Sequence, residues 1–160
     1  LEIPLRHKVT GTVLDAQGEP LPNARIEMRR VALLGDNTSE KSAFSAEDQR
    51  LLTLETNAEG VFTAWLEPKW EYDIVVSPST STNAPRGIFS LAPGEQELTL
   101  MLPEPMLIYG SVLDATLQGQ ANLLIEVHET FRNERRVIGE ARTGADGMFR
   151  LIAPAAAPKE

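Results

Sequence analysis

The sequence predicts an all-β protein, an antiparallel β-sandwich, and three of its features lead to that prediction. Short runs such as 9–13 and 24–28 alternate apolar and polar residues, and a period of two is typical of a half-buried strand. Gly, Pro, Asn and Asp gather between these runs and mark chain reversals. Apolar residues at helical spacing are almost absent. Many short strands separated by turns are typical of a two-sheet sandwich.

An internal duplication organises the chain. The stretch 9–28, VTGTVLDAQGEPLPNARIEM, recurs at 108–127 as IYGSVLDATLQGQANLLIEV. A second landmark follows in the same order, TNAEGVF at 56–62 and TGADGMF at 143–149. Two landmarks in one order indicate a tandem repeat, which we divide into a module at 1–103 and a second module at 104–160.

The first module is expected to hold about seven strands, enough for a closed two-sheet core. They are expected near 9–14, 24–28, 52–56, 61–66, 70–76, 88–91 and 97–102. The polar stretch 33–50 is longer than its counterpart and contains Ser45–Asp48, which resembles a helix capping box. Asn57–Gly60 is expected to be a turn with Gly60 at positive φ, and the Ser/Thr-rich 77–85 a loop.

The second module is expected to be truncated. About four strands are expected, and they lie near 106–114, 122–130, 136–143 and 148–152. The closing APAAAPKE contains prolines and cannot pair as a central strand. Leu117 stands where the first module has Gly18, so we expect this hairpin to turn differently, at Gly119. Missing strands would leave an open edge and a half-covered apolar face that contains Val112, Ile125, Val127 and Phe149.

Composition excludes several classes of function. The chain has 160 residues and a net charge of −8, which argues against nucleic acid and anionic membranes as partners. No apolar run approaches the ~20 residues that span a bilayer, so membrane insertion is not expected. Cysteine is absent, which removes disulfides, thiol nucleophiles and thiolate metal sites. The chain begins at Leu1, and we expect it to be a piece of a longer exported protein.

With these landmarks placed, the chain resembles the carboxypeptidase regulatory-like domain, a transthyretin-like (prealbumin-like) β-sandwich, in tandem. The residues that match are GTVLDAQGEPLPNARIEM, TNAEGVFTAWLEP and EYDIVV. The resemblance implies a non-catalytic domain that accompanies secreted peptidases, outer-membrane receptors or bacterial surface proteins. One departure is Trp70, which stands where the family has a glycine before its tyrosine strand.

Neither catalysis nor a cofactor or metal is expected. His7 and His128 are the only histidines, and no hydrolase, zinc or phosphate-binding motif is present. The hydroxyisourate hydrolases, an enzyme family of the same fold, end in Tyr-Arg-Gly-Ser, whereas this chain ends in APKE. Asp15, Asn57 and Glu59 supply oxygens that calcium would accept, but they lie in separate turns, and turn chemistry explains them better.

The aromatic residues are the candidate contacts. Tyr72 alternates with Ile74 and Val76 and is expected in the core. Trp65 could face either side of its strand. Trp70 is expected at a loop tip, where it either caps the open end of the sandwich or contacts a ligand. Exposed tryptophan is enriched at interfaces and can stack on a sugar ring.

We therefore expect a non-catalytic structural or protein-interaction module of a larger exported bacterial protein, located extracellularly, at the cell surface or in the periplasm. Its expected partners are other domains of the same longer protein or another exported protein, with a homodimer through residues 104–160 as one form. The alternative is a carbohydrate-binding accessory module that uses Trp65 and Trp70.

Overall fold

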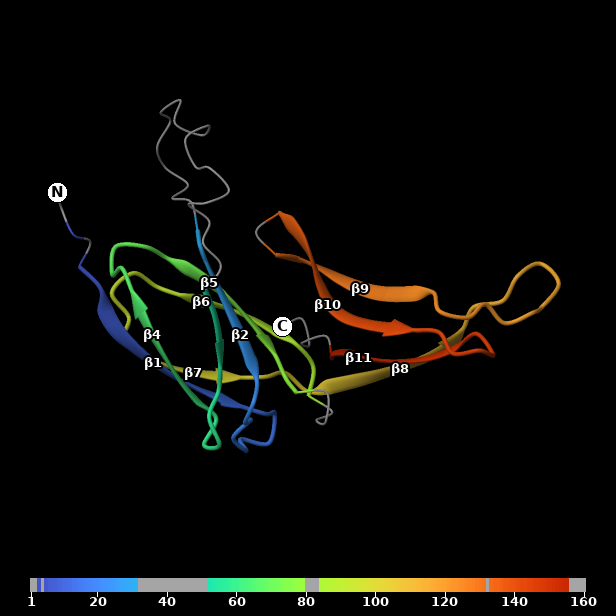
Figure 1. The fold of residues 1–160 in the computed structure, drawn as a ribbon, viewed down its shortest axis with the longest axis horizontal. Coiled ribbons are helices and arrows are strands. Elements are labelled where there is room, and N and C mark those ends of the chain that lie inside the picture. The colour runs from blue at the N-terminus through green and yellow to red at the C-terminus, as the bar shows by residue number, and fades with distance from the viewer. Residues whose placement is uncertain (1–2, 4, 32–51, 80–83, 132, 156–160) are drawn as a thin grey trace, which may run out of the picture. The chain divides into compact units, whose positions relative to one another are not determined.

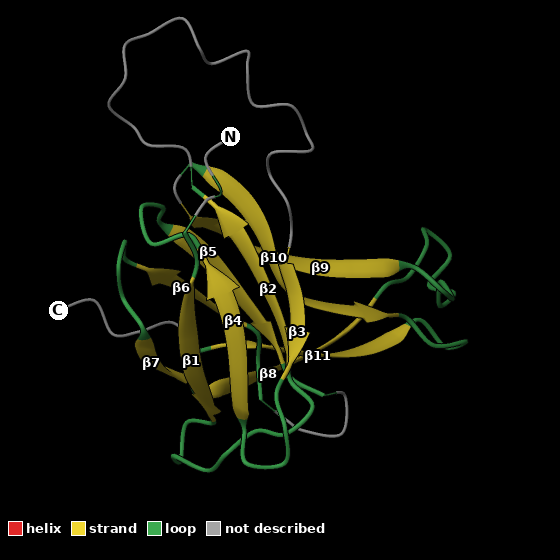
Figure 2. Cartoon of the chain, turned by 60° about the vertical axis from the view of Figure 1, so that its left-hand side comes forward, coloured by secondary structure: helices red, strands yellow, loops and turns green. Residues whose placement is uncertain are grey.

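The computed structural model describes residues 3, 5–31, 52–79, 84–131 and 133–155. Regular structure in this part of the chain consists of strands alone (Figure 2), and no helix there could cross a bilayer. The strands are β1 (His7–Leu14), β2 (Arg25–Arg30), β3 (Leu52–Glu55), β4 (Val61–Leu66), β5 (Tyr72–Ser77), β6 (Gly87–Leu91), β7 (Glu97–Met101), β8 (Pro105–Ser111), β9 (Leu124–Phe131), β10 (Glu134–Arg142) and β11 (Met148–Pro154). The all-β prediction is confirmed.

The chain forms two compact units. Unit 1 comprises Leu1–Ser79 and Ile88–Met101, and unit 2 comprises Thr80–Gly87 and Leu102–Glu160. The predicted insertion at 33–50, with its capping box, lies outside the described residues, and so does 80–83 of the predicted loop. The division into modules at 103 and 104 stays a prediction.

Unit 1 is a β-sandwich of two sheets, ordered β4-β1-β7 and β3-β2-β5-β6 (Figure 1). Strand β2 pairs antiparallel with both β3 and β5, and β1 pairs antiparallel with β4. Strand β7 pairs with β1 in parallel, Thr10 opposite Glu97, so the sandwich predicted as antiparallel includes one parallel pair. Strand β7 follows all four strands of the other sheet in the sequence, and the chain then crosses back to pair β7 with β1.

The core of unit 1 follows the period of two. Alternate side chains of each strand turn inward because successive Cβ atoms point to opposite faces of a sheet. The largest fully enclosed side chains are Val9 and Val13 of β1, Ile26 and Met28 of β2, Ile74 and Val76 of β5, and Leu91 of β6. Burial of each such side chain contributes roughly 1.5–3 kcal/mol, which makes this core the main source of stability for unit 1.

Unit 2 contains two ladders, β8 with β11 and β9 with β10. Their registers repeat those of unit 1. Gly110 lies opposite Phe149 as Gly11 lies opposite Phe62, and Ile125 lies opposite Ala141 as Ile26 lies opposite Leu54. Among the described residues no strand occupies the second edge of β8 or β9, whereas β7 and β5 occupy the equivalent edges of β1 and β2.

A buried threonine holds the same loop in both units. The Thr56 hydroxyl accepts a hydrogen bond from Ala24 N at 2.9 Å and donates to the Leu21 carbonyl at 2.6 Å. The Thr143 hydroxyl accepts from Leu123 N at 2.9 Å and donates to the Gln120 carbonyl at 2.6 Å. These bonds satisfy backbone groups, buried in unit 1 and partly buried in unit 2, where the chain leaves the first hairpin of each unit.

The prediction that the first hairpin of unit 2 turns differently is wrong. Leu117 adopts φ +63°, close to the +84° of Gly18. Leu117 N donates to the Asp114 carbonyl at 3.0 Å, and Gly18 N donates to the Asp15 carbonyl at 3.1 Å. Gly119 serves another purpose, because a Cβ there would lie 2.0 Å from the Asp146 carbonyl oxygen.

Several strand ends also differ from the prediction by one to three residues, and two of these differences have a clear physical reason. Strand β11 continues past residue 152 to Pro154, which lies opposite Pro105 at the end of the ladder. Proline is tolerated there because its missing N–H interrupts no interior ladder bond. Strand β5 begins at Tyr72 rather than at residue 70, because Trp70 lies in the preceding turn. The backbone N–H of Trp70 donates there to the Glu67 carbonyl at 3.4 Å.

Candidate functional site

A buried carboxylate organises the turn between β4 and β5. Glu67 follows the last residue of β4, and only 8% of its surface is exposed. Its Oε1 forms an ion pair with Arg30 Nη2, and its Oε2 accepts a hydrogen bond from Trp70 Nε1 at 3.1 Å. A buried charge is tolerated when it is paired and hydrogen-bonded, and both Glu67 oxygens meet that condition.

Two cations flank the Trp70 ring in the same cluster. Arg30 Cζ lies 5.5 Å and Lys69 Nζ 5.4 Å from the ring centroid, within the range of cation–π attraction. The ring itself is partly buried. Trp70 is therefore held by groups of its own unit, which favours the capping interpretation. A ligand contact at Trp70 stays a prediction.

Trp65 has a different environment. Phe62, Ala64 and Leu66 of β4 face the core, so Trp65 faces outward, with 60% of its surface exposed. It lies opposite Lys8 on β1, and on the same face Thr63 lies opposite Thr10. The outward face of β4-β1-β7 therefore presents an indole ring beside an ammonium group and two hydroxyls. Tyr72 is buried, as predicted.

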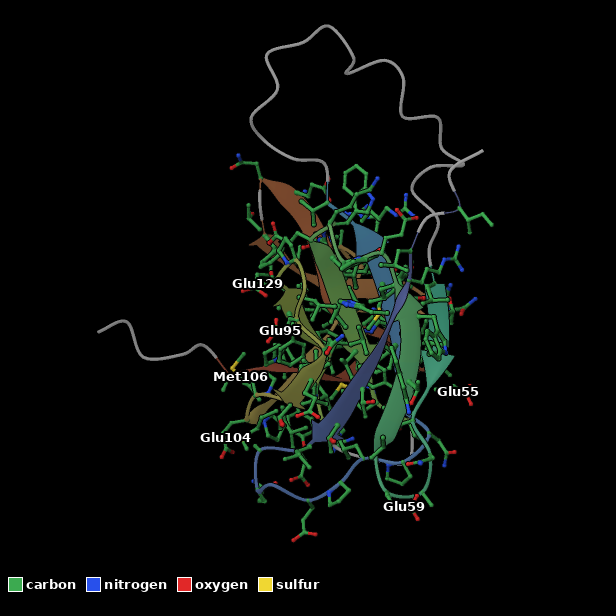
Figure 3. The ribbon with its side chains drawn as sticks, turned by 90° about the vertical axis from the view of Figure 1, so that its left-hand side faces the viewer. Glu55, Glu59, Glu95, Glu104, Met106 and Glu129 are labelled. Carbon is green, nitrogen blue, oxygen red and sulfur yellow. The ribbon has the colours of Figure 1, made fainter. Side chains whose placement is uncertain are left out.

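The side-chain oxygens of Asp15 and Asn57 accept hydrogen bonds from the backbone of their own turns. Asp15 Oδ1 accepts hydrogen bonds from Gln17 N and Glu19 N, and Asn57 Oδ1 accepts from Glu59 N and Val61 N. The Glu59 side chain extends outward from the tip of its turn (Figure 3). In the described part of the chain no three His, Asp or Glu side chains gather as a metal site would require.

Asp114, in the first hairpin of unit 2, has a clearly lowered pKa. The Thr116 hydroxyl donates to Asp114 Oδ1 at 2.7 Å, and the backbone N–H groups of Thr116 and Gln118 donate to the same oxygen. These bonds favour the charged form and lower the pKa of Asp114, with the Thr116 hydroxyl as the largest cause. Asp114 is fully exposed, and its carboxylate shapes the hairpin through these bonds.

The two histidines belong to different units, His7 to unit 1 and His128 to unit 2. His128 Nε2 on β9 lies 3.2 Å from Glu126 Oε2, and His7 Nδ1 on β1 lies 3.4 Å from Gln96 Nε2. Both contacts are on exposed side chains. That the chain carries no catalytic residue stays a prediction.

Unit 2 exposes positions that unit 1 buries. Ile26 and Met28 are fully enclosed, whereas their counterparts Ile125 and Val127 are partly exposed. Leu123, the counterpart of the enclosed Ala24, is 42% exposed. The sequence predicted a half-covered face with Val112, Ile125, Val127 and Phe149, and all four are partly exposed. It gave no sign of Tyr109, which is 64% exposed on β8.

Comparison with known proteins gives structural likenesses alone. No protein-family model and no curated protein matches the sequence. A streptococcal ancillary pilin is 16% identical with a TM-score of 0.43, over 96% of this chain and 51% of the pilin. The minor pilin of Streptococcus agalactiae is 14% identical with a TM-score of 0.43, over 92% of this chain and 79% of that one.

An enzyme gives a similar likeness. Catechol 1,2-dioxygenase from Pseudomonas arvilla is 15% identical with a TM-score of 0.41, over 99% of this chain and 55% of the enzyme. The chain thus spans about half the length of the ancillary pilin and of the dioxygenase. Pilins and an enzyme score alike, and no function follows from such scores.

Proposed function

We propose that this chain is a non-catalytic module of a larger exported bacterial protein and that it binds protein partners. The module consists of two carboxypeptidase regulatory-like domains in tandem, at 1–103 and 104–160. It is located extracellularly, at the cell surface or in the periplasm. The partners are other domains of the same longer protein or another exported protein. A homodimer through residues 104–160 is one form of this function.

The incomplete burial of unit 2 carries the proposal. Its two ladders keep the registers of unit 1, so the same apolar positions point inward. The strands that cover those positions in unit 1 have no counterpart among the described residues of unit 2. Exposed apolar residues and open strand edges favour association with another polypeptide.

Light scattering and a hydrophobic dye test this function. The whole chain is expected to self-associate as its concentration rises, or to bind 8-anilinonaphthalene-1-sulfonate while folded. A shortened chain of residues 1–103 is expected to do neither, because its core is enclosed. A whole chain that stays monomeric, unfolds cooperatively and binds no dye would contradict the proposed function.

Trp65 supports a second candidate, a carbohydrate-binding accessory module. A sheet face with an exposed indole, flanked by Lys8 and the Thr10 and Thr63 hydroxyls, offers the apolar and polar contacts that a sugar ring needs. Trp70 is the other aromatic of this candidate, although Arg30 and Lys69 already flank its ring.

A glycan array separates the two candidates. If the chain binds a polysaccharide through Trp65, Trp65→Ala is expected to abolish binding and to leave the melting temperature unchanged. Trp70→Ala is the companion variant: lower stability with binding retained would leave Trp65 as the contact, and loss of binding in a folded variant would make Trp70 a contact as well. An array on which the whole chain binds no glycan would remove this second candidate.

A further inference from the structure

Strand β9 has one edge that pairs with β10 and one edge that is unpaired among the described residues, which we call the free edge of β9. Of the open surfaces in the described residues, this is the one whose occupant the structure indicates most fully. Strand β2 shows what this edge accepts in a complete unit, because β2 and β9 hold equivalent partners, β3 and β10, in equivalent registers. On its other edge β2 carries β5, antiparallel, with Ile26 opposite Val76 and Met28 opposite Ile74. The other edge of β9 carries no strand among the described residues.

We propose that the free edge of β9 binds an extended segment of a protein partner as an antiparallel strand, in the register that β5 takes on β2. This inference rests on the proposed function and specifies its binding site. The bound segment places two apolar residues, two positions apart, opposite Ile125 and Val127. Backbone hydrogen bonds supply affinity in such strand addition, and alternate side chains supply specificity.

Charge defines a third position of the partner. Glu129 of β9 occupies the place of Arg30 on β2, which lies opposite Tyr72. Glu129 is exposed on β9 (Figure 3), and it lies on the same face as Ile125 and Val127 by the period of two. Arg136 of β10 lies opposite Glu129 on the paired edge of β9. A lysine or arginine on the free edge gives a second opposite-charge cross-strand pair with Glu129, so the partner segment is basic at this position.

A second copy of β9 fits this edge poorly. Suppose that two copies of β9 pair antiparallel over most of their length and keep their inward residues on one face. Every such register creates one of two conflicts. Glu126 or Glu129 falls opposite itself, or Glu129 falls opposite Ile125 or Val127. Like charges opposite one another destabilise a sheet, and an apolar partner leaves a carboxylate poorly solvated. The charges on β9 thus disfavour self-pairing and leave the edge open to a basic strand.

The β8 edge is the weaker acceptor. Its counterpart in unit 1, the edge of β1, takes β7 in parallel. Parallel pairing is slightly less stable per residue than antiparallel pairing. Pro105 at the start of β8 also lacks the N–H that a new ladder would use. Met106 of β8 (Figure 3) is exposed, but no charged residue of β8 specifies a partner.

A synthetic peptide tests the inference on the whole chain. The probe is the segment 71–78, EYDIVVSP, with Tyr72 replaced by Lys, so that the lysine falls opposite Glu129 in the expected register. Binding is followed by hydrogen exchange, in which the peptide is expected to slow the β9 amides and to leave those of β8 and β2 unchanged. A scrambled peptide of the same composition is the control for nonspecific binding.

A charge exchange makes the test specific. Glu129→Lys is expected to weaken binding of the lysine peptide on the order of fivefold and to restore it for a peptide with glutamate at the same position. Circular dichroism shows that the variant is folded. Three results would each overturn the inference: peptide binding that does not change with the charge at residue 129, protection of the β8 amides in place of the β9 amides, or no peptide binding.

Two outcomes separate this inference from the proposed function. If the chain binds dye or self-associates while β9 stays unprotected by the peptide, the strand-addition site is wrong and the proposed function stands. If β9 amides become protected with rising protein concentration and no peptide, a second copy is the occupant and the inference is wrong. If the chain neither associates nor binds dye or peptide, both fail.

Discussion

The Phe62 ring lies across Gly11 on the neighbouring strand, so closely that a Cβ on residue 11 would be 2.2 Å from Phe62 Cζ. Gly110 and Phe149 repeat the arrangement in unit 2, where the corresponding distance is 2.5 Å. A phenylalanine that covers a cross-strand glycine restores the apolar contact that the glycine lacks. Each glycine therefore admits the aromatic ring of its partner.

Alanine at residue 11 is expected to destabilise unit 1 by about 1–3 kcal/mol, because the enclosed Phe62 ring must leave its place. Gly110→Ala is the matched control and is expected to cost less, since the partly exposed Phe149 can turn toward solvent. Both tryptophans lie in unit 1, so their fluorescence during urea unfolding follows the first variant, and circular dichroism follows the second. Equal losses of stability in the two variants would show that the burial of the phenylalanine ring does not determine the cost of the substitution.

Glycine at residue 117 is expected to stabilise unit 2 by about 0.5–1 kcal/mol, because leucine is strained at positive φ. Little packing is lost, since Leu117 is 76% exposed. The converse variant Gly18→Leu is expected to destabilise unit 1 by about 1–2 kcal/mol. Thermal unfolding of both variants measures the difference. A destabilised Leu117→Gly variant would mean that the leucine side chain has a partner that outweighs its strain.

Phenylalanine at residue 70 is expected to lower the free energy of unfolding by about 1–2 kcal/mol. It keeps a ring for Arg30 and Lys69 but removes the N–H that donates to the buried Glu67 carboxylate. Trp65→Phe is the control, with an expected change near zero because Trp65 is exposed. Urea unfolding followed by circular dichroism compares them. Identical midpoints would remove the capping interpretation of Trp70.

Valine at residue 116 is expected to raise the pKa of Asp114 part of the way back to its ordinary value of 3.8, because the hydroxyl donor is lost and the two backbone donors remain. A carboxyl whose pKa is lowered by folding stabilises the fold above its unfolded pKa. That contribution disappears as the pH falls through the folded pKa. A nuclear magnetic resonance titration of Asp114 measures both variants. An unchanged pKa would show that the backbone bonds alone lower it.

Local signals predicted most of the strands. The alternation in VFTAWL and the turn residues Asn57–Gly60 are properties of neighbouring residues, and the structure places β4 and a positive-φ Gly60 where they indicated. The same alternation fixes the outward direction of Trp65, since Phe62 and Ala64 face the core. The sequence interpretation left that direction open.

Long-range partners left no local signal. Arg30 lies on β2 and Glu67 lies in the turn after β4, 37 residues later, and no sequence pattern around either residue indicates the other. The turn at Leu117 misled for a related reason. The Asp114 carboxylate and the backbone bonds of the hairpin decide its geometry, and they override the conformational preference of a single residue.

The parallel pairing of β7 with β1 has a consequence for how the chain folds. The β9-β10 hairpin joins two strands that are consecutive in the chain, but β1 gains its second neighbour only when Glu97–Met101 has been made. Because pairing between distant residues slows folding, unit 1 is expected to fold late, after nearly all of it has emerged from the ribosome. Until then one edge of β1 is unpaired and exposed to non-native pairing with other strands.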